Sequence, residues 1–230
     1  MAEADRGLPG QVTIAVNMAN PSGVQLNIVE QRLSAERLGP YRAAVGGDLA
    51  EALALYRWNI LLSGAFYELL QDTEVVLRNA IHAQLTGHNG GNGFWFQRPG
   101  WFTSGTNTEI TQARQRVRRS GQVETPGHIV AELNFGFWRF LLTRQYDRRL
   151  WVPCLHRAFP HSSGRRADIH DAVAAAHTLR NRIAHHEPIH SRPHTQDEQT
   201  LLTLIGWICP DTQAWVETQN RLPHVLQQKP

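Results

Sequence analysis

The chain has 230 residues, of which 41% are hydrophobic and 19% are charged, an ordinary composition for a globular protein with a sizeable core. It contains no apolar run of the roughly 18 residues that a membrane-spanning helix needs, and residues 1–27 lack the basic patch and apolar block of a secretory signal. We therefore expect a cytoplasmic protein and not a membrane-spanning or secreted one.

The basic residues are almost all arginines. The formal net charge is +3, and of the 23 lysines and arginines only Lys229 is a lysine. Guanidinium groups bind phosphates through two parallel hydrogen bonds and stack on bases, so this composition suits a phosphate-bearing partner. A GC-rich genome would give the same bias, and the capacity to bind phosphate holds with either origin. Cys154 and Cys209 are too few for a disulfide framework and lack metal-ligand spacing, so we expect buried free thiols.

The first third of the chain predicts a lead-in, a short helix and a long helix. Residues 1–28 are small, polar and aperiodic, which favours a flexible lead-in or a short extended segment. Ser34 is a suitable N-cap for a short helix, which we expect to be broken near residues 39–40 and to end at residues 46–47. Asp48 then caps a long apolar-periodic region that reaches about residue 86. This region is either one helix or two nearly coaxial helices with a bend at Gly64.

The middle of the chain contains an aromatic loop followed by a basic helix. Residues 88–106 are rich in glycine and carry five aromatic residues. Their rings can stack on bases, but we favour the interpretation that they plug the end of a helical bundle. Residues 106–119 predict a helix with four arginines, at positions 114, 116, 118 and 119. This stripe is either a phosphate-contact surface or a plain solvated face.

The remaining segments also predict helices, at residues 127–146, 151–159, 165–187 and 199–215, the last interrupted at Pro210. No strand alternation and no repeat are visible. The sequence therefore predicts an all-α helical bundle. We place a single helical domain at residues 29–222, between the lead-in at 1–28 and a polar tail at 223–230.

The most informative segment is residues 179–188, which reads Leu-Arg-Asn-Arg-Ile-Ala-His-His-Glu-Pro. Its apolar residues keep a helical spacing, and Pro188 stops the helix. Asn181 and His185 are four residues apart and share one helix face, whereas Arg180 and His185 diverge by roughly 140° around the axis. A long arginine side chain can still reach the same pocket, or it can serve a pocket formed with a second subunit.

These residue types suit the cleavage of RNA without a metal. A base takes the proton of the 2′-hydroxyl, a cation stabilises the charge that develops on the phosphate, and an acid protonates the leaving 5′-oxygen. His185 fits the base or acid role because imidazole titrates near neutral pH. Arg180 fits charge stabilisation, and Asn181 can orient the phosphate or the imidazole. Two copies of His185 across a dimer would supply both the base and the acid.

A metal site is the competing interpretation of the histidines in and after this segment. His185, His186 and Glu187 are followed by His190 and His194. Pro188 interrupts the helix between the paired histidines, and no third ligand has a defined spacing. We therefore expect no metal, and we expect His186 and Glu187 to line the rim of the site or to cap the helix end.

The segment Arg180-Asn181-Arg182-Ile183-Ala184-His185 resembles the Arg-x4–6-His motif of the HEPN superfamily, and the longer string through Pro188 resembles its Abi-like (AbiD/AbiF) branch. Three other blocks are similar to signatures of that branch and occur in order, at residues 52–59, 74–81 and 133–138. The resemblance covers about residues 33–190. It does not cover the beginning of the chain or the segment after about residue 192.

The resemblance implies a HEPN-type bundle with short extra helices, a homodimer, and a metal-independent endoribonuclease that needs no cofactor. It implies a role in phage abortive infection or in a toxin–antitoxin system, with a protein or small RNA as possible antitoxin. Arg180, Asn181 and His185 are then the catalytic residues. The alternative is a non-catalytic RNA-binding or interaction protein of the same fold; a helical metalloenzyme is a third hypothesis.

Five further residues are expected to contact RNA or to support the catalytic pair: Glu74, Arg78, Asn79, Arg182 and His186. Glu74 and Arg78 are four residues apart, so they can form an ion pair on one helix face. This pair either braces Arg180 or His185 or is an ordinary structural pair. His82 is a further candidate for the pocket, and Asn59 is expected to brace a neighbouring backbone instead of touching substrate.

Overall fold

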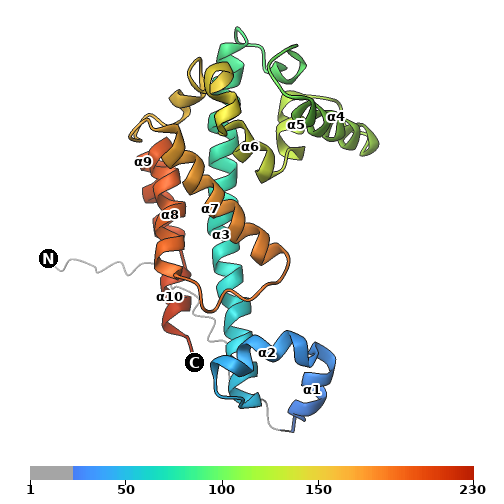
Figure 1. The fold of residues 1–230 in the computed structure, drawn as a ribbon, viewed down its shortest axis with the longest axis vertical. Helices are drawn as coiled ribbons and strands as arrows, with labels where there is room; N and C mark the ends of the chain where they lie inside the picture. The colour runs from blue at the N-terminus through green and yellow to red at the C-terminus, as the bar shows by residue number, and fades with distance from the viewer. Residues whose placement is uncertain (1–22) are drawn as a thin grey trace, which may run out of the picture. The chain divides into compact units, whose positions relative to one another are not determined.

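The structure, a computed structural model, describes residues 23–230, and all regular structure in this part of the chain is helical (Figure 1). The described residues form two compact units, residues 23–58 with Pro230, and residues 59–229. The all-α prediction is confirmed. The single domain predicted at 29–222 stays a prediction. None of the described helices combines the length and apolarity that a bilayer crossing requires.

The first unit contains α1 (Leu26–Leu33), α2 (Ala35–Ala44) and the beginning of α3. As predicted, Ser34 caps α2, because its hydroxyl accepts a hydrogen bond from the Arg37 amide at 3.2 Å. Two expectations are wrong. Of the lead-in predicted at 1–28, residues 1–22 lie outside the described part of the chain. Residues 26–28 belong to α1, so the lead-in ends earlier than predicted. Helix α1 begins without any side-chain cap.

Helix α2 also runs through residues 39–40, where a break was expected. Leu38 and Tyr41, on either side of the Gly-Pro pair, are fully buried. Their burial offsets the backbone hydrogen bond that Pro40 removes.

Helix α3 (Leu49–His88) is a single helix of 40 residues that continues from the first unit into the second. The Asp48 carboxylate accepts a hydrogen bond from the Glu51 amide at 2.9 Å, so the predicted cap is confirmed. The helix is continuous through Gly64, which rules out the alternative of two coaxial helices. It carries Asn59, Glu74 and Arg78 into the second unit.

The second unit adds the remaining helices around the rest of α3 (Figure 1). Pairs that pack together include α4 with α5, α6 with α7, α7 with α8, and α8 with α9. Their bounds are α4 (Ser104–Arg119), α5 (Pro126–Glu132), α6 (Phe135–Leu141), α7 (Arg166–Ala184), α8 (His194–Ile208), α9 (Pro210–Gln219) and α10 (Leu222–Gln227). Short turns lie between them at η1 (Trp95–Gln97), η2 (Arg144–Tyr146), η3 (Asp147–Trp151) and η4 (Leu155–Ala158).

The helix predicted at 127–146 is wrong in one respect, because it is two helices. Asn134 separates α5 from α6, and its side-chain oxygen accepts a hydrogen bond from the Phe137 amide at 2.9 Å. The polar tail expected at 223–230 is mostly α10, which is held by the buried Leu222 and Val225. Cys154 is a buried free thiol as expected, whereas Cys209 is only half-buried.

The aromatic loop plugs the bundle, as favoured from the sequence. Trp95 is fully buried, and Phe96 and Phe102 are nearly so. The Trp95 ring packs edge-on against Trp138, with ring centroids 6.2 Å apart. These buried rings cannot stack on bases.

The basic stripe of α4 is largely neutralised within the protein. Arg114 and Arg118 both pair with Glu124, at 2.6 and 2.9 Å, and Arg116 pairs with Glu132 at 2.8 Å. These pairs favour the interpretation of a structural, solvated face over that of a phosphate surface.

Candidate active site at the end of α7

The motif segment occupies the last turn of α7 and the residues that close it. Leu179 and Ile183 are buried and hold this face of the helix to the core. The Glu187 amide donates to the Arg182 carbonyl at 2.8 Å, and the His186 amide donates to the Ile183 carbonyl at 3.0 Å. This double closure is the Schellman arrangement of a helix end. His186 and Glu187 thus cap the helix, one of the two roles expected for them.

His186 is the residue with a left-handed backbone conformation at this helix end, with φ of +57°. Glycine is the usual residue at such a position, because a Cβ atom crowds the backbone there. The side chain of His186 is exposed. The chain therefore accepts a small conformational cost to keep a histidine beside His185.

The segment that follows α7 is anchored to α3. The side-chain oxygen of Asn59 accepts a hydrogen bond from the Ile189 amide at 2.8 Å, and both residues are buried. Asn59 therefore braces a neighbouring backbone, as predicted. This bond fixes where the chain goes after Pro188, and so it helps to fix the end of α7.

Arg180 and Asn181 are joined to a third residue, His177, one turn earlier on α7. A guanidinium nitrogen of Arg180 (Nη1) donates to Oδ1 of Asn181 at 3.4 Å, and Nδ2 of Asn181 lies 3.3 Å from Nε2 of His177. Because the Asn181 oxygen faces the arginine, its NH2 group must donate to the histidine, and Nε2 of His177 must be the acceptor. The imidazole of His177 is therefore neutral, with its proton on Nδ1.

The imidazole of His177 is held between α6 and α7. It stacks on Phe135 with ring centroids 5.6 Å apart and an angle of 14° between the planes. A Cβ atom at Gly136 would make an ordinary contact with Nε2 of His177, at 3.4 Å, and a tight one with Oδ1 of Asn134, at 3.1 Å. Burial lowers the pKa of His177, and the nearby guanidiniums of Arg139 and Arg180 lower it further.

Glu74 of α3 lies close to this group. Burial raises its pKa, and the charges of Arg180 and Arg78 act in the opposite direction. No ion pair joins Glu74 to Arg78 among the described residues, so the predicted pair does not form. The charge of Arg180 also acts on the carboxylate, without an ion pair between the two described side chains, so the brace stays a prediction.

Arg78 and Arg139 bring two more guanidiniums to the same region. The Nε atoms of both are buried and lack a hydrogen-bond partner among the described residues. A buried donor without a partner costs about 1–3 kcal/mol, so such groups are uncommon in folded proteins and call for an explanation. We refer to Arg78, Arg139 and Arg180 as the arginine cluster.

The structure brings together some of the predicted site residues and not others. Arg180, Asn181, Glu74 and Arg78 lie in one half-buried region. His185 is exposed directly after α7, and its side chain makes no hydrogen bond to any described residue.

The other predicted residues do not join this region. Asn79 is exposed. Arg182 is exposed and lies 3.9 Å from Glu187. His82 accepts a hydrogen bond from Trp95 Nε1 at 2.8 Å, so it serves the aromatic plug and not the pocket.

Two residues of the site, His177 and Arg139, were not predicted. His177 is four residues before Asn181, and this helical spacing was a usable signal for a pair on one face. Arg139 has no comparable signal in the sequence, because its proximity depends on the packing of α6 against α7.

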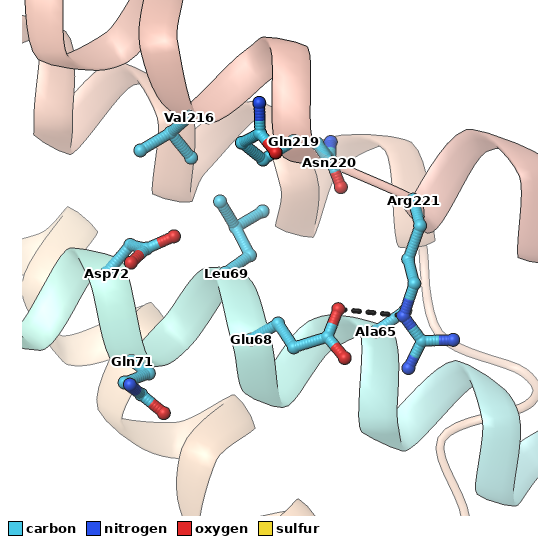
Figure 2. A pocket seen from close by; sticks show the side chains of 9 residues that line it. All are labelled: Ala65, Glu68, Leu69, Gln71, Asp72, Val216, Gln219, Asn220 and Arg221. Atoms are coloured by element: carbon cyan, nitrogen blue, oxygen red, sulfur yellow. Dashed lines mark hydrogen bonds and ion pairs between the residues drawn. The ribbon is translucent and has the colours of Figure 1, made fainter. Parts of the chain in front are cut away.

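A hollow elsewhere in the second unit is not a candidate for phosphate binding (Figure 2). It has a volume of about 270 Å³ and lies where α3 faces α9 and the beginning of α10. Its charged side chains include Glu68, which pairs with Arg221 at 2.7 Å, and Asp72. Burial and the charge of Glu68 raise the pKa of Asp72. The acidic side chains disfavour a phosphate here.

The described residues contain no group of three or more histidine, cysteine, aspartate or glutamate side chains placed to hold a metal ion. His190 is buried, and His194 Nε2 lies 2.7 Å from the Ile189 carbonyl oxygen, so these two histidines contribute to the structure after α7.

Comparison of the chain with protein-family models, with curated proteins and with solved structures finds no match. The chemistry of the site therefore rests on its own residues. A guanidinium, an amide and a neutral imidazole are joined by hydrogen bonds, and a second, exposed imidazole follows at the helix end. This arrangement can bind a phosphate and move a proton close to it.

Proposed function

We propose that this chain is a metal-independent endoribonuclease. The observation that carries the proposal is the half-buried position of Arg180 and Asn181 in a region rich in guanidinium groups, five and four residues before the exposed His185. A guanidinium that is held in place can stabilise the negative charge of a phosphate in the transition state. An exposed imidazole can reach the 2′-hydroxyl or the leaving oxygen.

In the proposed reaction an imidazole of His185 takes the proton of the 2′-hydroxyl, and the 2′-oxygen attacks the adjacent phosphorus. The bond from phosphorus to the 5′-oxygen breaks, and a protonated imidazole gives its proton to that oxygen. The products are a 2′,3′-cyclic phosphate and a 5′-hydroxyl. Arg180 stabilises the charge on the phosphate, and Asn181 orients it. The His185 of a second copy in a homodimer supplies the second imidazole.

The resemblance of the motif to the Abi-like branch of the HEPN superfamily supports the same activity and extends it to a biological role. We propose that the protein acts in the cytoplasm, in phage abortive infection or as the toxin of a toxin–antitoxin system. A protein or a small RNA would then hold it silent. The substrate is single-stranded RNA or the unpaired loop of a folded RNA, because in-line attack by the 2′-oxygen needs a backbone free of helical geometry.

Expression in bacterial cells tests this function. The parent chain should degrade cellular RNA and arrest growth, and Arg180→Ala and His185→Ala should do neither at the same protein level. Arg148→Ala is the matched control, since Arg148 is an exposed arginine away from the motif. If both motif variants degrade RNA and arrest growth as the parent does, the proposal is wrong.

A second candidate function is RNA binding without cleavage. It is favoured by the different surroundings of the two key side chains, because Arg180 is half-buried and bonds to Asn181, whereas His185 is exposed at the helix end and no hydrogen bond joins the two among the described residues. Binding of RNA with no product after long incubation, with or without a chelator, would select this function.

A further inference from the structure

The charge of the arginine cluster is not balanced inside the protein. Three of the four arginines of the α4 stripe, Arg114, Arg116 and Arg118, each pair with a carboxylate at distances of 2.6 to 2.9 Å. In contrast, no ion pair joins Arg78, Arg139 or Arg180 to a carboxylate in the described part of the chain. Arg78 and Arg180 lie close enough to Glu74 for their charges to act on its carboxylate, and Arg139 and Arg180 act in the same way on His177, so the three guanidiniums share one region of the second unit.

The cluster is assembled from three separate helices. Arg78 comes from α3, Arg139 from α6 and Arg180 from α7, and all three residues are half-buried. The Nε atoms of Arg78 and Arg139 are buried, and no described protein group accepts a hydrogen bond from either of them. The outer nitrogens of a guanidinium form a fork that matches two oxygens of a phosphate.

Two neighbouring residues keep this charge uncompensated. His177 accepts a hydrogen bond from Asn181 as a neutral imidazole, so it does not balance the positive charge of the cluster. Glu74 lies near Arg180 and Arg78 but forms an ion pair with neither among the described residues, and burial raises its pKa against the opposing effect of the two arginines. A half-buried site with excess positive charge and no carboxylate partner is suited to an anionic ligand.

We infer that Arg78, Arg139 and Arg180 together bind one phosphate of a single-stranded RNA backbone. The ligand class rests on the proposed function, and the inference adds Arg139 and α6 to the site. Arg139 then binds substrate and takes no part in proton transfer. Its removal should weaken RNA binding with little dependence on the RNA sequence, because a phosphate contact carries no base information.

Binding of a fluorescent 2′-O-methyl RNA oligonucleotide to the full chain tests the inference, since this strand lacks the 2′-hydroxyl and cannot be cleaved. Loss of a whole phosphate contact on a single strand reduces the salt slope by about 0.7, which corresponds to about a fivefold loss of affinity near 0.1 M salt, and loss of one of the three guanidiniums on that phosphate should lower the slope and the affinity by up to these amounts. Arg139→Gln should show both changes. Arg148→Gln removes the same charge from an exposed arginine and should show neither.

Equal affinities and equal salt slopes for Arg139→Gln and Arg148→Gln would overturn the inference. Inorganic phosphate should displace the oligonucleotide from the parent more strongly than chloride does at the same ionic strength, and Arg139→Gln should abolish this difference. If inorganic phosphate displaces the oligonucleotide from Arg139→Gln as strongly as from the parent, phosphate binds elsewhere on the protein and the inference is overturned.

Folding is checked by thermal unfolding at low salt without ligand. If Arg139 serves phosphate binding, Arg139→Gln should unfold at the same or a higher temperature than the parent, because it relieves repulsion in the cluster. A large drop would show a structural role and would contradict the inference. Arg78→Gln provides a second binding test from α3, with the same expected loss of affinity.

This experiment separates the inference from the proposed function. Because the oligonucleotide is not a substrate, a chain without nuclease activity can still show binding that depends on Arg139. A chain that cleaves RNA but binds equally well after Arg139→Gln would retain the proposed function and lose the inference.

Discussion

The side-chain amide of Asn181 donates a hydrogen bond to Nε2 of His177, with the two nitrogens 3.3 Å apart. The same amide accepts a hydrogen bond from Arg180 through its oxygen. The amide therefore keeps this orientation, with its oxygen toward Arg180, only while His177 is neutral. Protonated His177 would need an acceptor, and the amide would have to turn its oxygen away from the arginine.

This dependence predicts that His177 contributes to the pH dependence of stability. Its pKa in the folded protein is below the ordinary value of 6.5, because of burial first and then the charges of Arg139 and Arg180. Between these two pKa values the unfolded chain binds a proton that the folded chain does not bind. The free energy of unfolding therefore falls as the pH falls through this window, and is fully retained above it.

Urea unfolding between about pH 8 and about pH 5 measures this effect. In His177→Gln, which keeps an acceptor but does not titrate, the free energy of unfolding should fall less steeply with decreasing pH. His82 and His190 also have pKa values lowered by burial, so part of the pH dependence should remain. Parallel pH profiles for the parent and His177→Gln would contradict the position assigned to His177.

Glu74→Gln should strengthen RNA binding and weaken cleavage. The substitution removes the carboxylate charge close to Arg180 and Arg78, so the cluster attracts a phosphate more strongly, but Arg180 loses its support. Affinity for the 2′-O-methyl oligonucleotide should rise severalfold while the single-turnover cleavage rate falls. Affinity that decreases in Glu74→Gln would indicate that Glu74 itself faces the RNA or holds the fold.

Asn59→Ala should destabilise the protein without touching the chemistry directly. The substitution leaves the buried Ile189 amide without its acceptor, which costs about 1–3 kcal/mol. Asn79→Ala is the control, because Asn79 is exposed and its loss should change the free energy of unfolding by less than about 0.5 kcal/mol. Similar unfolding midpoints for the two variants would show that the bond does not anchor the segment after α7.

His186→Gly should raise the free energy of unfolding by about 1 kcal/mol, because glycine adopts the left-handed conformation without the steric cost of a Cβ atom. If His186 only caps the helix, the variant should cleave RNA as fast as the parent. A more stable variant with slower cleavage would instead show that the imidazole contacts RNA, the other role predicted for it. A less stable variant would contradict the steric argument.

The features that local sequence determines were predicted well. Asp48 and Ser34 are caps recognised by residue type alone, and the apolar periodicity of α3 predicts a long helical region, although it leaves open a bend at Gly64. The end of α7 was also predictable, since Pro188 limits the helix and polar residues crowd its last turn. In each case a few neighbouring residues decide the conformation.

The features that depend on tertiary packing were missed. Helix α1 lacks a side-chain cap, so its beginning leaves no signal in the sequence. The sequence predicts Asn134 inside an apolar helix, whereas in the structure its side chain caps the beginning of α6. The four-residue spacing of His177 and Asn181 is a signal that the sequence offers, but the stacking of His177 on Phe135 is a contact that no spacing rule predicts.

The most direct test of the account is single-turnover cleavage of a labelled single-stranded RNA by the purified chain in the presence of a chelator, with analysis of the product ends. The account predicts 2′,3′-cyclic phosphate and 5′-hydroxyl ends, a rate about 10²–10⁴-fold lower for His185→Ala, and a rate about 10²–10³-fold lower for Arg180→Ala. Cleavage by both variants at the rate of the parent, or products with 3′-hydroxyl ends, would contradict it.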